Sequence, residues 1–286
     1  MSVCKLCPND CSVDRDKTVG YCGVGSELKI AKYAKFTLEE PCISGTRGSG
    51  AIFFCGCPMK CVFCQNYEVS RNKVGRVITT DEFIDIIKEL EDEGVHNVNL
   101  VNPTHYVGEI VKAFKKYRPK IPVVYNTHGY EKIETLKEID EYVSVYLPDL
   151  KYFSPATSKR YSGKENYFDV ASKAVEFMSK KPLVVKDGIM QSGCIIRHLI
   201  LPLNTADSIN VVTWVKERIN DKAYLSLMSQ YTPFGEIENY PELKRPITKK
   251  EYDRVLDKVY ELGLTNVFVQ DFESVGTQYI PVWGEN

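Results

Sequence analysis

Short apolar, β-branched runs alternate with amphipathic helical segments through most of the chain, and this alternation constrains the fold more than any other feature. The predicted strands are AIFF (51–54), NVNLV (97–101), IPVVY (121–125), VSVYL (143–147), CIIRHLIL (194–201), AYLSLM (223–228) and TNVFV (265–269). The predicted helices cover residues 79–94, 106–117, 131–140, 165–181, 207–219 and 247–263. Near-continuous apolar strands alternating with helices are typical of a parallel sheet covered by helices. The sequence therefore predicts an α/β fold with a complete or partial barrel.

The charge balance limits the classes of partner. The chain has 37 Lys and Arg against 38 Asp and Glu, which gives no electrostatic sign of binding to nucleic acid or to an anionic membrane. The sequence contains no run of 18 or more apolar residues, so it predicts no membrane-spanning helix. Its start, MSVCKLCPND, lacks the basic and apolar regions of a secretory signal. We therefore expect a cytoplasmic protein with no nucleic-acid or membrane partner.

The chain has ten cysteines, most of them clustered, and a disulfide framework is unlikely in a cytosolic protein, so they point to metal. The first group is Cys4, Cys7, Cys11 and Cys22, and the second is Cys55, Cys57, Cys61 and Cys64. Cys42 and Cys194 stand apart and are most simply buried small residues. This division predicts a cysteine-rich N-terminal segment (1–45) and a larger domain (46–286), with the Gly- and Ser-rich run 40–50 as the seam.

The N-terminal group has the spacing C-x2-C-x3-C-x10-C. Four thiolates can close a tetrahedral zinc site or hold a second [4Fe-4S] cluster. A segment this short cannot bury a core of its own, so a metal would supply folding energy. Spacing does not separate zinc from a cluster, and free or redox-paired thiols are the remaining alternative.

The second group contains the central motif, Cys57-x3-Cys61-x2-Cys64, directly after the first predicted strand. A [4Fe-4S] cluster held by three cysteines leaves one iron open to a small molecule, whereas a structural zinc site is closed by four ligands. Phe63 adds an aromatic face beside this loop. Cys55 offers the rival interpretation, because with the other three it could close a zinc site.

Parallel β/α barrels carry their chemistry at the C-terminal ends of the strands. The polar residues that follow the predicted strands include Asn102, Thr104, His105, Asn126, His128, Asp149, Lys151, Gln230, Tyr231 and Gln270. We expect them to share one rim, on which His105, His128 and Tyr231 could face a substrate. The aromatic and polar segment 271–283 could cover the mouth of the barrel or pack as a C-terminal tail.

The run GSGAIFFCGCPMKCVFCQNYE resembles the cluster loop of radical S-adenosylmethionine (SAM) enzymes. Together with PDLK (148–151) and CKLCPNDC, it is most similar to the branch related to pyruvate formate-lyase activating enzyme, in an uncharacterised subgroup with a cysteine-rich N-terminus. The resemblance implies a partial (β/α)6-type barrel. It also implies that Cys57, Cys61 and Cys64 bind a [4Fe-4S] cluster whose open iron chelates SAM.

The resemblance also implies contacts with SAM. The adenine would touch backbone near Phe63, and Asn102 and Thr104 stand where the family has a Gly-Gly-Glu segment that contacts the amino group. Asn126 ends the third predicted strand and is assigned to the same site.

In PDLK, Asp149 would contact the ribose or order the site, and Lys151 would pair with the SAM carboxylate. Arg197 would lie near the methionyl end. Gln230 or Tyr231 would replace a SAM-contacting histidine of the family.

The implied activity is reductive cleavage of SAM to a 5′-deoxyadenosyl radical, which abstracts hydrogen from a protein or peptide, for example as an activase of a glycyl-radical enzyme. The implied protein is an oxygen-sensitive oxidoreductase with an electron donor such as flavodoxin or ferredoxin. A small-metabolite substrate, another peptide modification, and a non-catalytic zinc or iron–sulfur interaction module are the alternatives.

Overall fold

Seven parallel strands form the centre of the computed structural model, which describes residues 3–270, Phe272 and Trp283. They are β2 (Ser49–Phe54), β4 (Val98–Val101), β5 (Val123–Thr127), β6 (Val145–Pro148), β8 (Ile189–Leu199), β9 (Tyr224–Met228) and β10 (Val267–Val269). They pair in chain order, each parallel to the next. All seven predicted strands are thus confirmed, because buried β-branched runs mark central parallel strands clearly.

Three antiparallel strands were not predicted: β1 (Lys29–Phe36), β3 (Arg76–Val77) and β7 (Val184–Lys186). β1 pairs with β2 and β3 pairs with β1, while β7 pairs with β8. The sequence of β1, KIAKYAKF, is only partly buried, so it lacks the continuous apolar run of a central strand. β1 extends the sheet from within residues 1–45, and the division of the chain at residue 45 stays a prediction.

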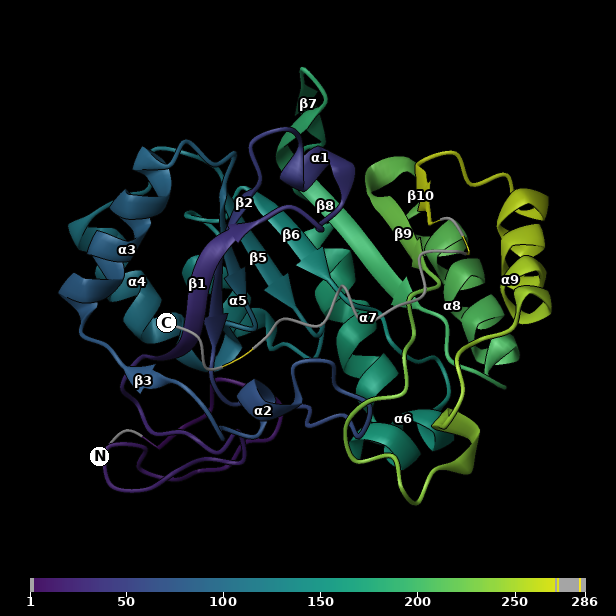
Figure 1. Ribbon diagram of the computed structural model, residues 1–286, viewed down its shortest axis with the longest axis horizontal. Helices are drawn as coiled ribbons and strands as arrows, with labels where there is room; N and C mark the ends of the chain where they lie inside the picture. Colours follow the sequence, from purple (N-terminus) through teal and green to yellow (C-terminus); the bar gives the residue numbers. More distant parts are fainter. Residues whose placement is uncertain (1–2, 271, 273–282, 284–286) are drawn as a thin grey trace.

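Helices cover the outer face of the sheet (Figure 1). They are α3 (Thr80–Asp92), α4 (Val107–Lys116), α5 (Ile133–Ile139), α6 (Pro155–Ser162), α7 (Tyr167–Met178), α8 (Thr205–Arg218) and α9 (Lys249–Glu261), with short helices α1 (Pro41–Ser44) and α2 (Tyr67–Ser70). The six predicted helices are confirmed within a few residues at their ends. The unpredicted α6 begins after the Ser154 cap.

The inner face of the sheet encloses a separate small core next to α1. Cys42 and Ile43 of α1 pack there with strand residues Val124, Val145 and Ile195. Part of the predicted seam therefore folds as a helix and closes the barrel interior at the end where the strands begin (Figure 1). Cys194 is buried in the main core, so both isolated cysteines are buried as expected.

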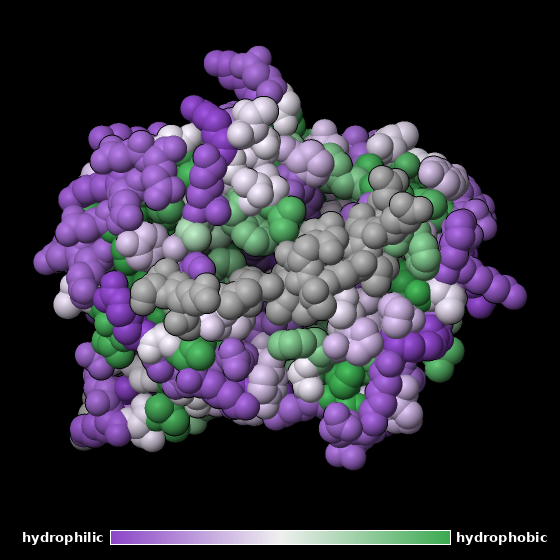
Figure 2. All heavy atoms as spheres, viewed as in Figure 1, coloured by the Kyte–Doolittle hydropathy of each residue, from purple (hydrophilic) through white to green (hydrophobic). Residues whose placement is uncertain are grey.

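The sheet is a partial barrel. In the described part of the chain, no strand pairing joins β10 to β3, so the sheet stays open there. Figure 2 shows hydrophilic side chains around the periphery of one face, with apolar surface nearer its centre. No helix among the described residues is long and apolar enough to span a bilayer.

Candidate active site

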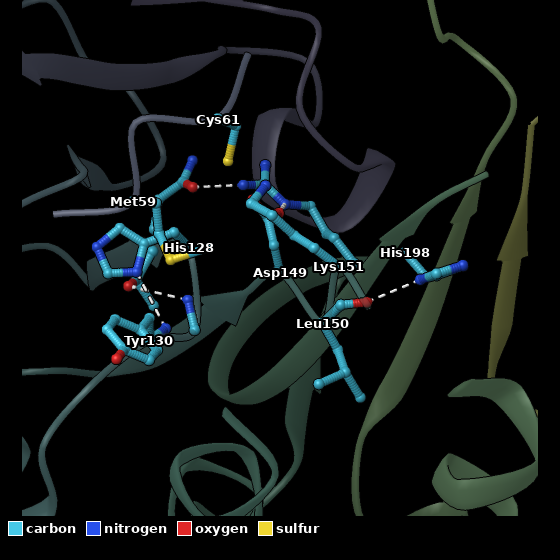
Figure 3. Close-up of polar contacts among 12 residues, drawn as sticks. Met59, Cys61, His128, Tyr130, Asp149, Leu150, Lys151 and His198 are labelled. Carbon is cyan, nitrogen blue, oxygen red and sulfur yellow. Dashed lines mark hydrogen bonds and ion pairs between the residues drawn. The ribbon is translucent and has the colours of Figure 1, made fainter. Parts of the chain in front are cut away.

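One pocket opens at the C-terminal ends of the parallel strands and collects most of the predicted site residues. Its lining includes Cys57, Cys61, Phe63, Cys64, Asn102, Asn126, Asp149, Lys151, Arg197 and Gln230. Figure 3 shows Cys61 facing the group formed by Asp149 and Lys151, with His128 beside them. The fold thus brings side chains from six strand ends and the cysteine loop to one cavity, as parallel β/α architecture requires.

The cysteine loop is held between β2 and α2 by hydrogen bonds to its sulfurs and backbone. The N–H of Met59 donates to Cys57 Sγ (3.4 Å), and the Ser162 hydroxyl donates to Cys61 Sγ (3.1 Å). Gly56, which opens the loop, has a φ of +82° that favours glycine. An added Cβ there would lie 2.7 Å from the carbonyl oxygen of Cys22, so the loop also depends on close approach of the N-terminal segment.

Cys55 does not join the other three thiols. Its side chain is fully buried, and its thiol donates to the carbonyl oxygen of Val74 (3.2 Å) outside the pocket. Residues two apart share a face only within a strand, but β2 ends at Phe54 and Gly56 turns the chain with a φ of +82°, so Cys55 and Cys57 point in different directions. The rival set of four cysteines is therefore not assembled in this structure.

The three pocket thiols suit a soft metal centre. Burial raises the pKa of Cys57 to about 12, and the neighbouring Cys64 and Cys61 thiolates add to this effect. Burial likewise raises the pKa of Cys64. All ten cysteines are free of disulfides, and among the described residues no three His, Cys, Asp or Glu side chains stand at metal-binding spacing. Three sulfur donors around one cavity fit an iron–sulfur cluster, whose binding would displace their protons.

Four charged side chains form a buried chain across the pocket. Lys151 Nζ pairs with Asp149 Oδ2 (2.6 Å), and Arg197 Nε pairs with Asp149 Oδ1 (2.8 Å). Arg197 Nη1 pairs in turn with Glu39 Oε2 (3.3 Å). Basic and acidic groups thus alternate from the cysteine loop towards the start of the strands.

These pairs change the protonation behaviour of their members. Burial alone would raise the pKa of Asp149, but Arg197 and Lys151 outweigh burial and hold the pKa below its ordinary value. Burial lowers the pKa of Lys151, but its pairing with Asp149 produces a net rise. Glu39 differs, because burial outweighs Arg197 and raises its pKa to about 7.

Glu39 is a charged pocket residue that sequence reasoning missed. It lies in the connection between β1 and α1, upstream of the first predicted strand, yet it lines the pocket with the three cysteines. A single acidic residue belongs to no motif whose spacing could identify it from the sequence. Asn99, which donates from Nδ2 to Glu39 Oε1 (3.0 Å), was missed for the same reason.

Thr104, Tyr231 and His105 do not line this pocket, contrary to expectation. The Thr104 hydroxyl donates to the buried Glu131 (2.6 Å), and the Tyr231 hydroxyl donates to the carbonyl oxygen of Leu243 (2.7 Å). All three side chains are almost completely buried. Residues after a strand alternate between the cavity and the surrounding core, which the linear sequence does not resolve.

The histidines near the rim are neutral. Burial lowers the pKa of His105 and of His128 to about 3. His128 lines the pocket, and its Nδ1 accepts a hydrogen bond from the Tyr130 N–H (3.0 Å). His105 Nε2 bonds to the carbonyl oxygen of Cys55 (2.8 Å). Figure 3 shows His198 bonded to Leu150, on the far side from Cys61.

The N-terminal cysteines lie next to the cysteine loop. Burial raises the pKa of Cys7 to about 11 against hydrogen bonds from Asn9, and the neighbouring Cys11 and Cys22 raise it further. The Tyr21 N–H donates to Cys11 Sγ (3.2 Å). The four N-terminal cysteines do not line the pocket, and Cys11 and Cys22 lie near enough to Cys7 to raise its pKa.

Backbone contacts join the two cysteine groups. The Cys57 N–H donates to the carbonyl oxygen of Cys22 (3.1 Å), and Asn9 Nδ2 donates to the carbonyl oxygen of Pro58 (3.0 Å).

Most of the aromatic segment 271–283 lies outside the described residues. Within it, the Trp283 ring packs edge-on against Phe53, with ring centroids 5.2 Å apart. Phe53 lines the pocket. Gln270 Nε2, just before this segment, donates to Gln230 Oε1 (3.1 Å).

The family model described as the radical SAM superfamily matches residues 51–193, half of the chain and the part that carries the cysteine loop. The chain belongs to the radical SAM superfamily. Membership implies a [4Fe-4S] cluster, SAM and a reductant. The three thiols of the pocket suit the cluster. The matched range ends within β8 and includes Asp149 and Lys151.

Relatives of this radical SAM chain agree with the fold and leave its substrate open. An uncharacterized protein of Methanocaldococcus jannaschii is 29% identical over 93% of this chain and 76% of its own length. The crystal structure of Streptococcus suis SuiB bound to precursor peptide SuiA has a TM-score of 0.53 at 16% identity, over 75% of this chain. Our chain spans 46% of that structure, so the likeness concerns the fold alone.

A domain of pyruvate-formate lyase-activating enzyme from Bacteroides vulgatus matches at a TM-score of 0.39 and 12% identity, over 67% of this chain and 91% of that domain. A likeness this low supports no conclusion about function.

Proposed function

We propose that this radical SAM chain binds its cluster through Cys57, Cys61 and Cys64 and cleaves SAM reductively in the adjoining pocket. The observation that carries the proposal is that three thiols line the same cavity as Asp149 and Lys151 while Cys55 is turned away. When bound, the cluster supplies the electron that breaks a C–S bond of the sulfonium and gives methionine and a 5′-deoxyadenosyl radical.

The side chains of the pocket divide the work of holding SAM. Lys151 Nζ has Asp149 as its partner among the described residues and keeps further N–H donors for the SAM carboxylate. Asp149, fixed between Lys151 and Arg197, contacts the ribose or orders the two cations. Asn102 Nδ2 donates to the carbonyl oxygen of Gly56 (2.7 Å), and its buried Oδ1 has no partner among the described residues, so that oxygen can accept from the SAM amino group.

Aromatic packing keeps the loop rigid on the adenine side. The ring of Phe63 contacts Tyr152, Tyr161 and Tyr231 edge-on. Backbone near Phe63 is therefore held in place for the adenine. The same aromatic packing shields this side of the loop from solvent.

Anaerobic reconstitution with iron and sulfide, followed by reduction with dithionite in the presence of SAM, tests this function. We expect 5′-deoxyadenosine from the native protein and from Cys55→Ala, and none from Cys57→Ala. Product from Cys57→Ala, or its absence from a fully loaded native protein, would contradict the proposal.

For the hydrogen donor we favour a protein or peptide, including a glycyl-radical enzyme. The Asp149-Leu-Lys151 match to activating enzymes supports this choice, and a protein of similar fold was crystallised with a precursor peptide. Leu38 lines the pocket and is 44% exposed, next to Phe36 and Met228. An apolar edge of this kind suits an inserted peptide side chain.

A small metabolite or another peptide modification is the second candidate. Anaerobic capture of a partner, with EPR of the mixture, distinguishes them. A glycyl doublet on the partner supports the activase, whereas turnover of a metabolite without any partner supports the second candidate.

We further propose that flavodoxin or ferredoxin supplies the electron and that Cys4, Cys7, Cys11 and Cys22 hold zinc or a second cluster. The support is the juxtaposition of these thiols with the cysteine loop through the Cys22–Cys57 backbone bond. Iron, zinc and sulfide analysis of the purified protein decides between the two metals.

A further inference from the structure

Glu39 enters the pocket from the end opposite the cysteine loop. It directly precedes the α1 region, which lies near the start of β8, whereas α2 follows the cysteine loop at the other end of the strands (Figure 1). Its backbone N–H donates to Ser44 Oγ (3.0 Å), which fixes the connection. The N-terminal part of the chain thereby supplies a carboxylate to the barrel interior.

Both carboxylate oxygens of Glu39 are engaged. Oε1 accepts from Asn99 Nδ2 (3.0 Å) and Asn126 Nδ2 (3.3 Å), and Oε2 pairs with Arg197 Nη1 (3.3 Å). Asn126 completes a closed arrangement, because its Oδ1 accepts from Arg197 Nη2 (2.5 Å). With Asp149 on Nε, the guanidinium is held from three sides, and Glu39 fixes the side farthest from Lys151.

The charges of the four linked side chains balance only when Glu39 is counted. The carboxylates Glu39 and Asp149 face the cations Arg197 and Lys151, and the side chains of all four are 10–20% exposed. Without Glu39 this group would carry one excess positive charge in a poorly solvated site, where charge interactions are strong. SAM carries a sulfonium, an ammonium and a carboxylate, and is therefore a cation.

We propose that Glu39 is a positioning residue of the SAM pocket, which holds Arg197 in place and cancels its charge so that a cationic nucleotide can bind. The proposal rests on the function proposed above, since it assumes that SAM occupies this pocket. The Glu39 charge should favour SAM over S-adenosylhomocysteine, which has the same groups without the sulfonium charge.

The protonation of Glu39 gives the proposal a pH signature. Burial raises the pKa of Glu39 to about 7 against the opposing effect of Arg197, while Glu40 and Asp149 raise it and the Asn99 amide lowers it. Below that pH the carboxyl is neutral, so the pocket gains a positive charge and repels SAM. Binding of the cation favours the carboxylate, so SAM affinity should fall as the pH decreases through 7.

Equilibrium dialysis on the cluster-loaded, unreduced protein tests this, because neither ligand is cleaved there. At pH 8 we expect Glu39→Gln to weaken SAM binding roughly tenfold more than S-adenosylhomocysteine binding. Its SAM affinity should lose the pH-dependent step. Glu39→Asp keeps the charge and should keep the preference for SAM even if both ligands bind less tightly.

The matched control is Glu40→Gln, which removes the same charge from the neighbouring position without lining the pocket. Glu40→Gln should retain the pH step, shifted to lower pH because Glu40 raises the pKa of Glu39. Iron content and thermal melting establish that each variant is loaded and folded.

Equal weakening of both ligands in Glu39→Gln would overturn the proposal. If that variant does not fold, a native SAM affinity that is flat from pH 6 to 8 would also overturn it. Failure of the loaded native protein to bind either ligand would instead reject the proposed function.

Discussion

The two cysteine groups lie side by side, but they face different surroundings. The N-terminal cysteines Cys4, Cys7, Cys11 and Cys22 lie in an irregular segment, where Cys11 and Cys22 raise the pKa of Cys7. The thiols of Cys57, Cys61 and Cys64 follow a central strand and line a cavity with charged residues from other strands. A group of four thiols outside the pocket suits the closed centre that we propose for it, whereas three thiols around a cavity leave room for a ligand.

The largest expected effect comes from removing all three pocket thiols. The variant Cys57→Ala/Cys61→Ala/Cys64→Ala should lose 5′-deoxyadenosine formation completely, because the cluster has no remaining ligands. It should keep the metal of the N-terminal group, measured by iron and zinc analysis. Loss of all metal from this variant would show that the two groups are not independent centres.

Removing one N-terminal thiol should affect stability before chemistry. If the N-terminal group holds the metal that we propose, Cys22→Ala should lose it and lower the melting temperature by roughly 5–10 °C, because such a metal supplies folding energy to a segment with little core. Cys42→Ala, a buried cysteine outside both groups, is the control and should keep all metal. Unchanged metal content in Cys22→Ala would contradict a closed four-thiol centre.

Gly56→Ala should disturb the contact between the groups. Alanine at a φ of +82° with a Cβ 2.7 Å from the Cys22 carbonyl oxygen should cost about 2–3 kcal/mol of unfolding free energy. Gly163→Ala has a similar φ of +65° but meets no atom within 4 Å, so it isolates the backbone strain. Denaturant unfolding should show the larger loss at Gly56, and equal losses would mean that the Cys22 contact is dispensable.

The smallest expected effect is on stability at Tyr231, which lies just outside the pocket, next to Gln230, which lines it. Tyr231→Phe should cost about 1 kcal/mol of stability by removing the bond to Leu243, with SAM affinity unchanged. Gln230→Ala, one residue earlier and lining the cavity, should weaken SAM binding instead. Equilibrium dialysis and thermal melting measure SAM affinity and stability for both variants. Weaker SAM binding in Tyr231→Phe would show that Tyr231 belongs to the pocket.

Spacing and periodicity were informative wherever a local pattern was enough. The seven parallel strands were predictable because buried strands read as continuous apolar runs. β1 was not, because lysines at every third position make it resemble a surface segment until β2 lies beside it. Cys57 and Cys61 were identified by spacing, whereas Cys55, two residues earlier, needed the structure to show which side of the loop it faces.

By itself, the sequence determined the strand–helix alternation and a C-x3-C-x2-C loop at a strand end, because both depend on neighbours along the chain. Only the tertiary structure decided which residues meet across the barrel. Glu39 reaches Arg197 through a distance of 158 residues in sequence, and no local pattern encodes such a pair. Burial then raises the pKa of Glu39, because desolvation depends on everything packed around the side chain and not on the residue type alone.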